Sequence, residues 1–141
     1  MQPEMYYVDT CVWLNILKDE VRSGVDFGAI ALDFLTRVQG KNCKLAVSPI
    51  VLKELQFKLD SSFEKVRIKL VRLASVELVA VRDVDYKLAR KFESEHALLS
   101  FFDYLHVAIA FRLNFVLVTR DKNLLNFASQ YVEAALPEDI T

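Results

Sequence analysis

The side chains in this sequence that are best suited to chemistry are four carboxylates, which lie far apart along the chain: Asp9, Glu54, Asp103 and Asp121. Carboxylates that are brought together repel one another and tend to retain protons unless a cation lies between them. A site built from oxygen ligands alone suits Mg²⁺ or Mn²⁺. One or two such ions can lower the pKa of a bound water and stabilise the charge on a phosphodiester under attack. If the four acids converge, hydrolysis of a nucleic-acid backbone is the chemistry that they support best.

Each of these acids also has a purely structural interpretation. Asp9 could cap a helix, and Asp103 completes a capping box that begins at Ser100. Asp121 lies in a polar turn, where aspartate is common, and Glu54 could be a solvated helix residue. A capping position also presents its side chain at the edge of a sheet, so these interpretations do not exclude a shared site.

Short apolar strands alternate with longer helical segments in this chain. Strands are expected at 5–8, 44–47, 76–81 and 115–118, with an edge strand at 131–134. Helical spacing of apolar residues predicts helices at 12–17, around 30–38, from Pro49 onward, after Ser61, and at 86–93, 102–113 and 124–128, with a loop at 18–27. This alternation predicts a three-layer α/β/α fold with a central, mostly parallel sheet of four to five strands.

Ligand sites in such folds lie outside the carboxyl ends of the strands. Asp9 follows the first predicted strand and Asp121 follows the fourth. Glu54 lies on the helix that leaves the second strand, and Asp103 lies in the first turn of the helix at 102–113. The four acids are therefore expected to meet at one edge of the sheet.

Size and composition are consistent with a single nuclease domain over residues 1–141. The chain is 53% hydrophobic and 26% charged, and its net charge of −1 argues against a protein that binds nucleic acid through a broad positive surface. An acidic metal pocket stays possible, because bound cations reverse the local field. Cys11 and Cys43 lack metal-site spacing, and two cysteines do not indicate a disulfide framework. A reducing compartment is therefore expected. No apolar run is long enough for a membrane helix, and we expect a cytoplasmic protein.

Four segments of the chain resemble the motifs of PIN domains. They are YYVDT at 6–10, SPIVLKEL at 48–55, FDYLHVAIA at 102–110 and VLVTRD at 116–121, and each contains one of the four acids. The order and spacing of these motifs extend through nearly the whole chain.

The resemblance implies a metal-dependent endoribonuclease, and the length is similar to that of VapC-like toxins, which cleave structured RNA such as tRNA or rRNA. It also implies Mg²⁺ or Mn²⁺ as cofactor, a small antitoxin protein as partner and a homodimer. The implied site consists of four acids that bind metal and activate water, and of two threonines that support them: Asp9, Glu54, Asp103 and Asp121, with Thr10 and Thr119.

Two positions depart from the family pattern. Cys11 follows Asp9 and Thr10 where a small polar residue, often asparagine, is usual. Some members carry a further acid shortly after the fourth motif, whereas this chain has Asn123 and Asn126 in that stretch. A weaker or single metal site is therefore possible.

Several other side chains could take part in binding. Lys53 and Arg120 adjoin two of the acids and could contact the RNA backbone. His106 lies one helical turn after Asp103, where core packing is expected to outweigh a role as ligand or base, and His96 is expected to be solvated. The aromatic residues Trp13, Phe27, Phe34 and Phe57 are expected mostly in the core, with a groove for a partner peptide as the alternative.

Two competing functions follow from the same residues. A catalytically weak or inactive PIN-fold module acting in RNA or protein binding would accommodate Cys11 and the missing extra acid. A phosphatase with an aspartyl nucleophile fits less well, since a dehalogenase-type site needs Asp-x-Asp after the first strand and the chain has Asp9-Thr10-Cys11.

Overall fold

The computed structural model describes residues 4–18, 21–72 and 75–140 of the chain. A five-stranded sheet in the order β5-β4-β1-β6-β7 forms its centre, and every neighbouring pair of strands is parallel. The strands are β1 (Glu4–Val8), β4 (Cys43–Val47), β5 (Val76–Leu78), β6 (Val116–Val118) and β7 (Ala134–Ala135). The predicted three-layer α/β/α fold with a parallel sheet of four to five strands is confirmed.

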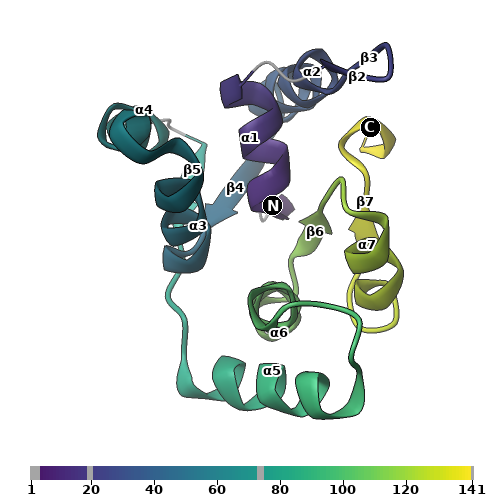
Figure 1. The fold of residues 1–141 in the computed structure, drawn as a ribbon. Coiled ribbons are helices and arrows are strands. Elements are labelled where there is room, and N and C mark those ends of the chain that lie inside the picture. The colour runs from purple at the N-terminus through teal and green to yellow at the C-terminus, as the bar shows by residue number, and fades with distance from the viewer. Residues whose placement is uncertain (1–3, 19–20, 73–74, 141) are drawn as a thin grey trace.

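Helices cover both faces of the sheet (Figure 1). They are α1 (Thr10–Lys18), α2 (Phe27–Gln39), α3 (Pro49–Leu59), α4 (Phe63–Arg72), α5 (Asp83–Glu95), α6 (Phe101–Leu113) and α7 (Lys122–Ala128), with short 3₁₀ turns η1 (Asp60–Ser62) and η2 (Pro137–Asp139). In Figure 1, α1 and α2 lie on one face and α5 and α6 on the other, while α3 and α4 flank the β5 side and α7 flanks the β7 side. None of the helices in the described ranges is long and apolar enough to cross a membrane.

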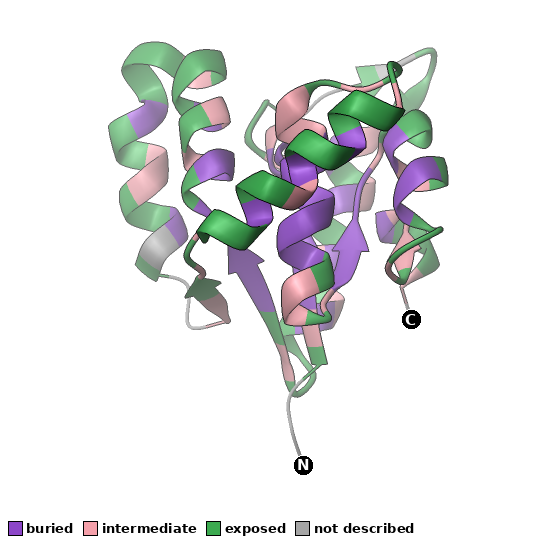
Figure 2. Ribbon diagram, turned by 90° about the horizontal axis from the view of Figure 1, so that it is seen from below, coloured by how far each residue is buried: buried purple, intermediate pink, exposed green. Residues whose placement is uncertain are grey.

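Helix α6 is the central helix of the core. Seven consecutive residues, 104–110, are buried, and Figure 2 shows this buried helix behind α5, whose outer side is exposed. A helix enclosed on all sides needs no polar face, which explains why residues 104–110 are apolar or aromatic apart from His106. His106 is therefore completely buried among core side chains.

An ion pair joins the start of α5 to the end of α6. The Arg112 guanidinium donates through Nε to Asp85 Oδ1 (2.8 Å) and through one terminal nitrogen to Asp85 Oδ2 (3.0 Å) and to the carbonyl of Ala80 (2.8 Å). Asp85 is buried, and it also accepts a bond from the backbone N–H of Arg82 (2.8 Å). The bidentate geometry fixes the start of α5 against the end of α6.

The prediction of a loop at 18–27 was wrong. Lys18 ends α1, Phe27 begins α2, and a two-stranded hairpin of β2 (Val21–Arg22) and β3 (Val25–Asp26) lies between them. Ser23 and Gly24 form the turn with φ angles of 51° and 78°. Positive φ at both central residues is the geometry of a type I′ turn, which matches the twist of the two strands.

Two of the predicted strands differ in extent. The strand expected at 76–81 extends only over Val76–Leu78. The N–H of Val79 makes one further bond to the carbonyl of Val47, and the chain leaves the sheet after it. The edge strand expected at 131–134 is Ala134–Ala135, since Tyr131 and Val132 donate to the carbonyl of Ala128 in the turn after α7.

Candidate active site

The four acids line a single hollow at the carboxyl edge of the sheet. Asp9, Glu54, Asp103 and Asp121 share this hollow with Thr10, Cys11, Leu14 and Lys58. A carboxylate oxygen of Asp9 and one of Glu54 lie within 4.8 Å of each other. The expected spatial convergence of the acids therefore occurs in the structure.

Serine caps and one strand pairing place these acids. Ser48 caps α3 by accepting from the N–H of Val51 (3.4 Å), which sets Glu54 on the second turn. Ser100 caps α6 by accepting from the N–H of Asp103 (3.2 Å). Asp9 is tied to β6 because its N–H donates to the carbonyl of Val118 (2.9 Å). The residues that start the helices thus determine where the acids lie.

Asp121 combines a structural and a site position. Its Oδ1 accepts from the N–H groups of Asn123 (2.9 Å) and Leu124 (3.2 Å), so it caps α7 as the turn interpretation expected. Within the described ranges its Oδ2 has no hydrogen-bond partner, and the side chain lines the acidic hollow. One oxygen holds the helix and the other is left for a ligand.

Two threonine hydroxyls orient the buried acids. Thr119 donates to Asp9 Oδ2 at 2.9 Å, and Thr10 donates to Glu54 Oε1 at 2.9 Å. The N–H of Thr10 also donates to Asp9 Oδ1 at 2.8 Å. Hydrogen bonds from groups outside the ligand set fix the direction in which the remaining lone pairs point.

His106 contacts the cluster directly, which the core-packing interpretation did not anticipate. It is completely buried, as expected, but its Nε2 lies 2.6 Å from Glu54 Oε1 and 3.6 Å from Asp9 Oδ1. Its Nδ1 lies 2.7 Å from the hydroxyl of Tyr7, which in turn lies 2.6 Å from Ser48 Oγ. Both ring nitrogens lie within hydrogen-bond distance of a partner, so His106 holds Glu54 in place, and one atom each of Asp9, Glu54 and His106 lie within 4.8 Å of one another.

The electrostatics of the hollow favour a bound cation. Burial raises the pKa of Asp103, and the nearby charge of Asp9 raises it further. Burial alone would also raise the pKa of Glu54, but the hydrogen bond and charge of His106 and the Thr10 hydroxyl outweigh it, so that the pKa of Glu54 is lowered. The donor set consists of hard oxygen ligands around like charges, which is what Mg²⁺ or Mn²⁺ binds.

A family comparison matches the PIN domain over residues 6–130. This chain belongs to the PIN-domain family. No curated protein sequence matches it, but the fold is similar to solved structures of toxin–antitoxin complexes. These include VapBC2 from Rickettsia felis bound to a DNA fragment from its promoter (20% identity, TM-score 0.66, 94% of this chain and 98% of that chain). A toxin–antitoxin complex from Klebsiella pneumoniae is also similar (15% identity, TM-score 0.67, 96% of this chain and 99% of that chain). So is VapBC-1 from nontypeable Haemophilus influenzae (18% identity, TM-score 0.67, 94% of this chain and 98% of that chain).

Cys11 closes the side of this PIN site next to Asp9. Its Sγ donates to Asp9 Oδ2 (3.2 Å), lies 3.6 Å from the Thr119 hydroxyl and accepts from the N–H of Arg120 (3.4 Å). Burial raises the pKa of the thiol, and the charge of Asp9 raises it further, so Cys11 stays a neutral donor. It therefore stabilises the charge on Asp9, as a small polar residue would.

The basic side chains beside the PIN site have different surroundings. Lys58, on α3, lines the acidic hollow. Lys53 instead lies with its Nζ 5.7 Å from the ring centroid of Phe102, outside that hollow. Arg120 is paired with Glu138 through both terminal nitrogens, one of them at 2.8 Å, and its guanidinium lies 4.9 Å from the ring centroid of Phe27. RNA contacts by Lys53 and Arg120 stay predictions, and for Arg120 they require the pair with Glu138 to open.

Two aromatic residues depart from their expected surroundings. His96 was predicted to be solvated, but it is half-buried and its ring packs edge-on against Phe127 at 5.0 Å. Trp13 and Phe34 lie in the core as expected, whereas Phe57 is 75% exposed on α3.

Sequence periodicity missed the contact of His106 with Glu54 because two helices from distant segments form it. The signal that could have suggested it is a histidine on an otherwise apolar helix, one turn after an acid.

Proposed function

We propose that this PIN domain is a Mg²⁺- or Mn²⁺-dependent endoribonuclease that hydrolyses phosphodiester bonds. The observation that carries the proposal is the convergence of four carboxylates, from four separate segments, in one hollow. Family membership supports nuclease chemistry, and the raised pKa of Asp103 indicates that the hollow accommodates its full negative charge poorly without a cation.

In this proposal, Asp9, Glu54, Asp103 and Asp121 hold the metal. When bound, the ion would lower the pKa of a water and offset the charge on the phosphate. Thr119 and Thr10 keep the lone pairs of Asp9 and Glu54 turned toward the hollow.

Two further side chains support this arrangement. His106 prevents Glu54 from rotating away, since its Nε2 donates to Oε1. Lys58 places a positive charge at the mouth of an otherwise acidic hollow, where it can attract the RNA backbone.

We infer that the nuclease is the toxin of a toxin–antitoxin pair and forms a homodimer. The similar solved structures are VapBC and other toxin–antitoxin complexes, which supports a small antitoxin as partner. A narrow apolar groove between α1, α2 and α4 offers a surface for it, lined by Trp13, Ile16, Leu17, Leu35, Val66, Lys69 and Leu70. Among the described residues, the buried Nε1 of Trp13 has no hydrogen-bond partner. Both cysteines are free thiols, which is consistent with a cytoplasmic location.

Cleavage of a tRNA mixture tests the proposal directly. The purified chain is incubated with RNA in EDTA and then with increasing MgCl₂ or MnCl₂. We expect cleavage only with the divalent ion, and a loss of more than about 100-fold in Asp9→Asn and Asp103→Asn, because each removes a ligand rather than a supporting group. Asp33→Asn is the matched control, since Asp33 is an exposed acid on α2 that pairs with Arg37, away from the acidic hollow.

The outcomes separate the nuclease from its alternative. Cleavage by the wild type and by Asp33→Asn, with none by the two site variants, supports the proposal. Equal cleavage by all four proteins would identify a contaminating nuclease and overturn it. Folded wild-type protein that binds RNA and Mn²⁺ without cleaving would identify a binding module instead.

A further inference from the structure

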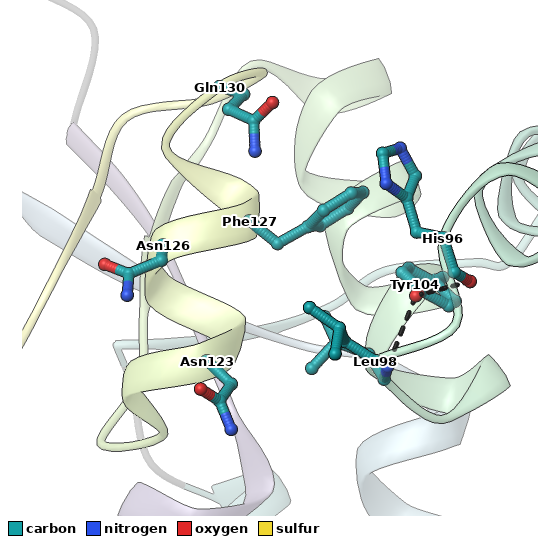
Figure 3. A pocket seen from close by; sticks show the side chains of 8 residues that line it. His96, Leu98, Tyr104, Asn123, Asn126, Phe127 and Gln130 are labelled. Carbon is teal, nitrogen blue, oxygen red and sulfur yellow. Dashed lines mark hydrogen bonds between the residues drawn. The ribbon is translucent and has the colours of Figure 1, made fainter.

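A second hollow lies between α7 and the segment that leads into α6 (Figure 3). Its volume is about 230 Å³, and it is lined by His96, Leu98, Leu99, Tyr104, Asn123, Asn126, Phe127 and Gln130. Pockets for drug-sized ligands measure about 300–1,000 Å³, so this one suits a single small ring system.

One wall of this hollow is fixed before any ligand arrives. The hydroxyl of Tyr104, a fully buried residue, donates to the carbonyl of His96 (3.0 Å) and accepts from the N–H of Leu99 (3.2 Å). These two bonds hold the segment 96–99 in one conformation. A ligand that enters therefore does not have to order this segment, which lowers the entropic cost of binding.

Aromatic rings form the floor of the hollow and an exposed leucine forms its rim. The ring of Phe127 lies 5.1 Å from that of Tyr104 and 5.0 Å from that of His96, both nearly perpendicular to it. Leu98 is 90% exposed and, in Figure 3, extends between Tyr104 and α7. An apolar side chain so exposed beside aromatic rings can cover the face of a flat ligand.

The third wall carries amide groups. Asn123 and Gln130 lie on the same side of α7 and of the turn after it as Phe127, and Figure 3 shows their amides above and below that ring. Within the described ranges neither side chain makes a hydrogen bond, so their donors and acceptors are free for a ligand. No lysine, arginine, aspartate or glutamate lines the hollow. This chemistry suits an uncharged heterocycle with hydrogen-bonding edges and does not suit a phosphate.

The two hollows are built on the same two segments. The N–H of Asn123 donates to the carboxylate of Asp121 (2.9 Å), and Leu99 directly precedes Ser100, whose side chain caps the turn that carries Asp103. We propose that the second hollow binds an unpaired nucleobase of the RNA substrate, next to the phosphodiester that is cut. This inference rests on the proposed ribonuclease function and adds to it that the substrate presents a single-stranded base.

The test measures base recognition separately from cleavage. Fluorescent oligoribonucleotides of five residues, each a homopolymer of A, C, G or U, are titrated with the full chain in EDTA, together with versions that are abasic at the central position. We expect at least one sequence to bind about tenfold more tightly than its abasic counterpart, as for a base packed on aromatic rings. Asn123→Ala and Gln130→Ala should reduce that ratio to near one.

Gln39→Ala is the matched control. Gln39 is an exposed amide at the end of α2 that leads into the amino end of β4, away from both hollows. The ratio should be unchanged in this variant. Abasic and intact oligonucleotides that bind equally, or amide variants that behave like Gln39→Ala, would overturn the inference even if the protein cleaves RNA. Base-dependent binding without metal-dependent cleavage would instead overturn the proposed nuclease function and leave the base site standing.

Discussion

The buried chain of hydrogen bonds behind Glu54 allows one prediction to be worked out in detail. In Tyr7→Phe only a hydroxyl is removed, but that hydroxyl lies 2.6 Å from Ser48 Oγ and 2.7 Å from His106 Nδ1. Tyr7, Ser48 and His106 are all completely buried. The change therefore leaves two buried polar groups without one of their partners, and water cannot replace it without opening the core.

The size of the effect follows from these two losses. Leaving one buried polar group unsatisfied costs about 1–3 kcal/mol, so with two such groups the free energy of unfolding should fall by about 2–6 kcal/mol. For 141 residues, a loss of 1 kcal/mol corresponds to a drop of roughly 3–4 °C in Tm. His106 also loses the bond that sets the orientation of its ring, and its hold on Glu54 weakens. Changes to such supporting partners reduce metal affinity by about 10–100-fold.

Two measurements and one control check this reasoning. Urea unfolding in EDTA gives the stability, and calorimetric titration with Mn²⁺ gives the affinity. Tyr6→Phe is the control, since Tyr6 is the neighbouring buried tyrosine on β1, packs edge-on against Phe34, and has no contact with His106. Its stability should change by less than about 1 kcal/mol. If Tyr7→Phe and Tyr6→Phe have the same free energy of unfolding, the buried network does not contribute to stability. If Tyr7→Phe is less stable but binds Mn²⁺ as tightly as Tyr6→Phe, His106 does not position Glu54.

Three further outcomes follow from the charges. Asp103→Asn should raise the stability of the metal-free protein, by about 0.5–2 kcal/mol, because it removes a half-buried acid whose pKa is raised by burial and by Asp9; a lower Tm in EDTA would contradict this. Mn²⁺ affinity should rise with pH through the raised pKa of Asp103 and then level off, since the proton competes with the metal; the same pH profile in Asp103→Asn would show that another group is responsible. Arg112→Leu should cost about 3–5 kcal/mol by leaving Asp85 buried and unpaired, and urea unfolding that matches the wild type would refute it.

The layered fold could be predicted because the sequence pattern is local and regular. A parallel strand buried on both faces is an unbroken apolar run, and Leu117 and its neighbours in β6 show that pattern. The rule that functional groups follow such strands then placed Asp9 and Asp121 at one edge. The hairpin at 21–26 escaped prediction because its strands have two residues each, and the turn residues Ser23 and Gly24 carry the only signal.

The sequence predicted the acids of the candidate site and the two supporting threonines, Thr10 and Thr119, but not the buried contacts of His106 and Tyr7. A carboxylate after a strand can be recognised in the sequence, whereas the contact of His106 with Glu54 joins residues 52 positions apart. That contact depends on the packing of α3 against α6, which helical periodicity does not specify. The same holds for Tyr7: its place in the apolar run of β1 predicts that the side chain is buried, but not which polar group its hydroxyl contacts.

The acids of the hollow are unequally supported, and this bears on the missing extra acid and on Cys11. Asp9 receives bonds from the Thr10 N–H, the Thr119 hydroxyl and the Cys11 thiol, and Glu54 receives bonds from His106 and Thr10. These donors stabilise the charged form of Glu54, whose pKa is lowered. Asp103 has less such support, and burial and the charge of Asp9 raise its pKa. Under the proposed function, a cation would therefore be needed chiefly at Asp103, where such donors are fewer.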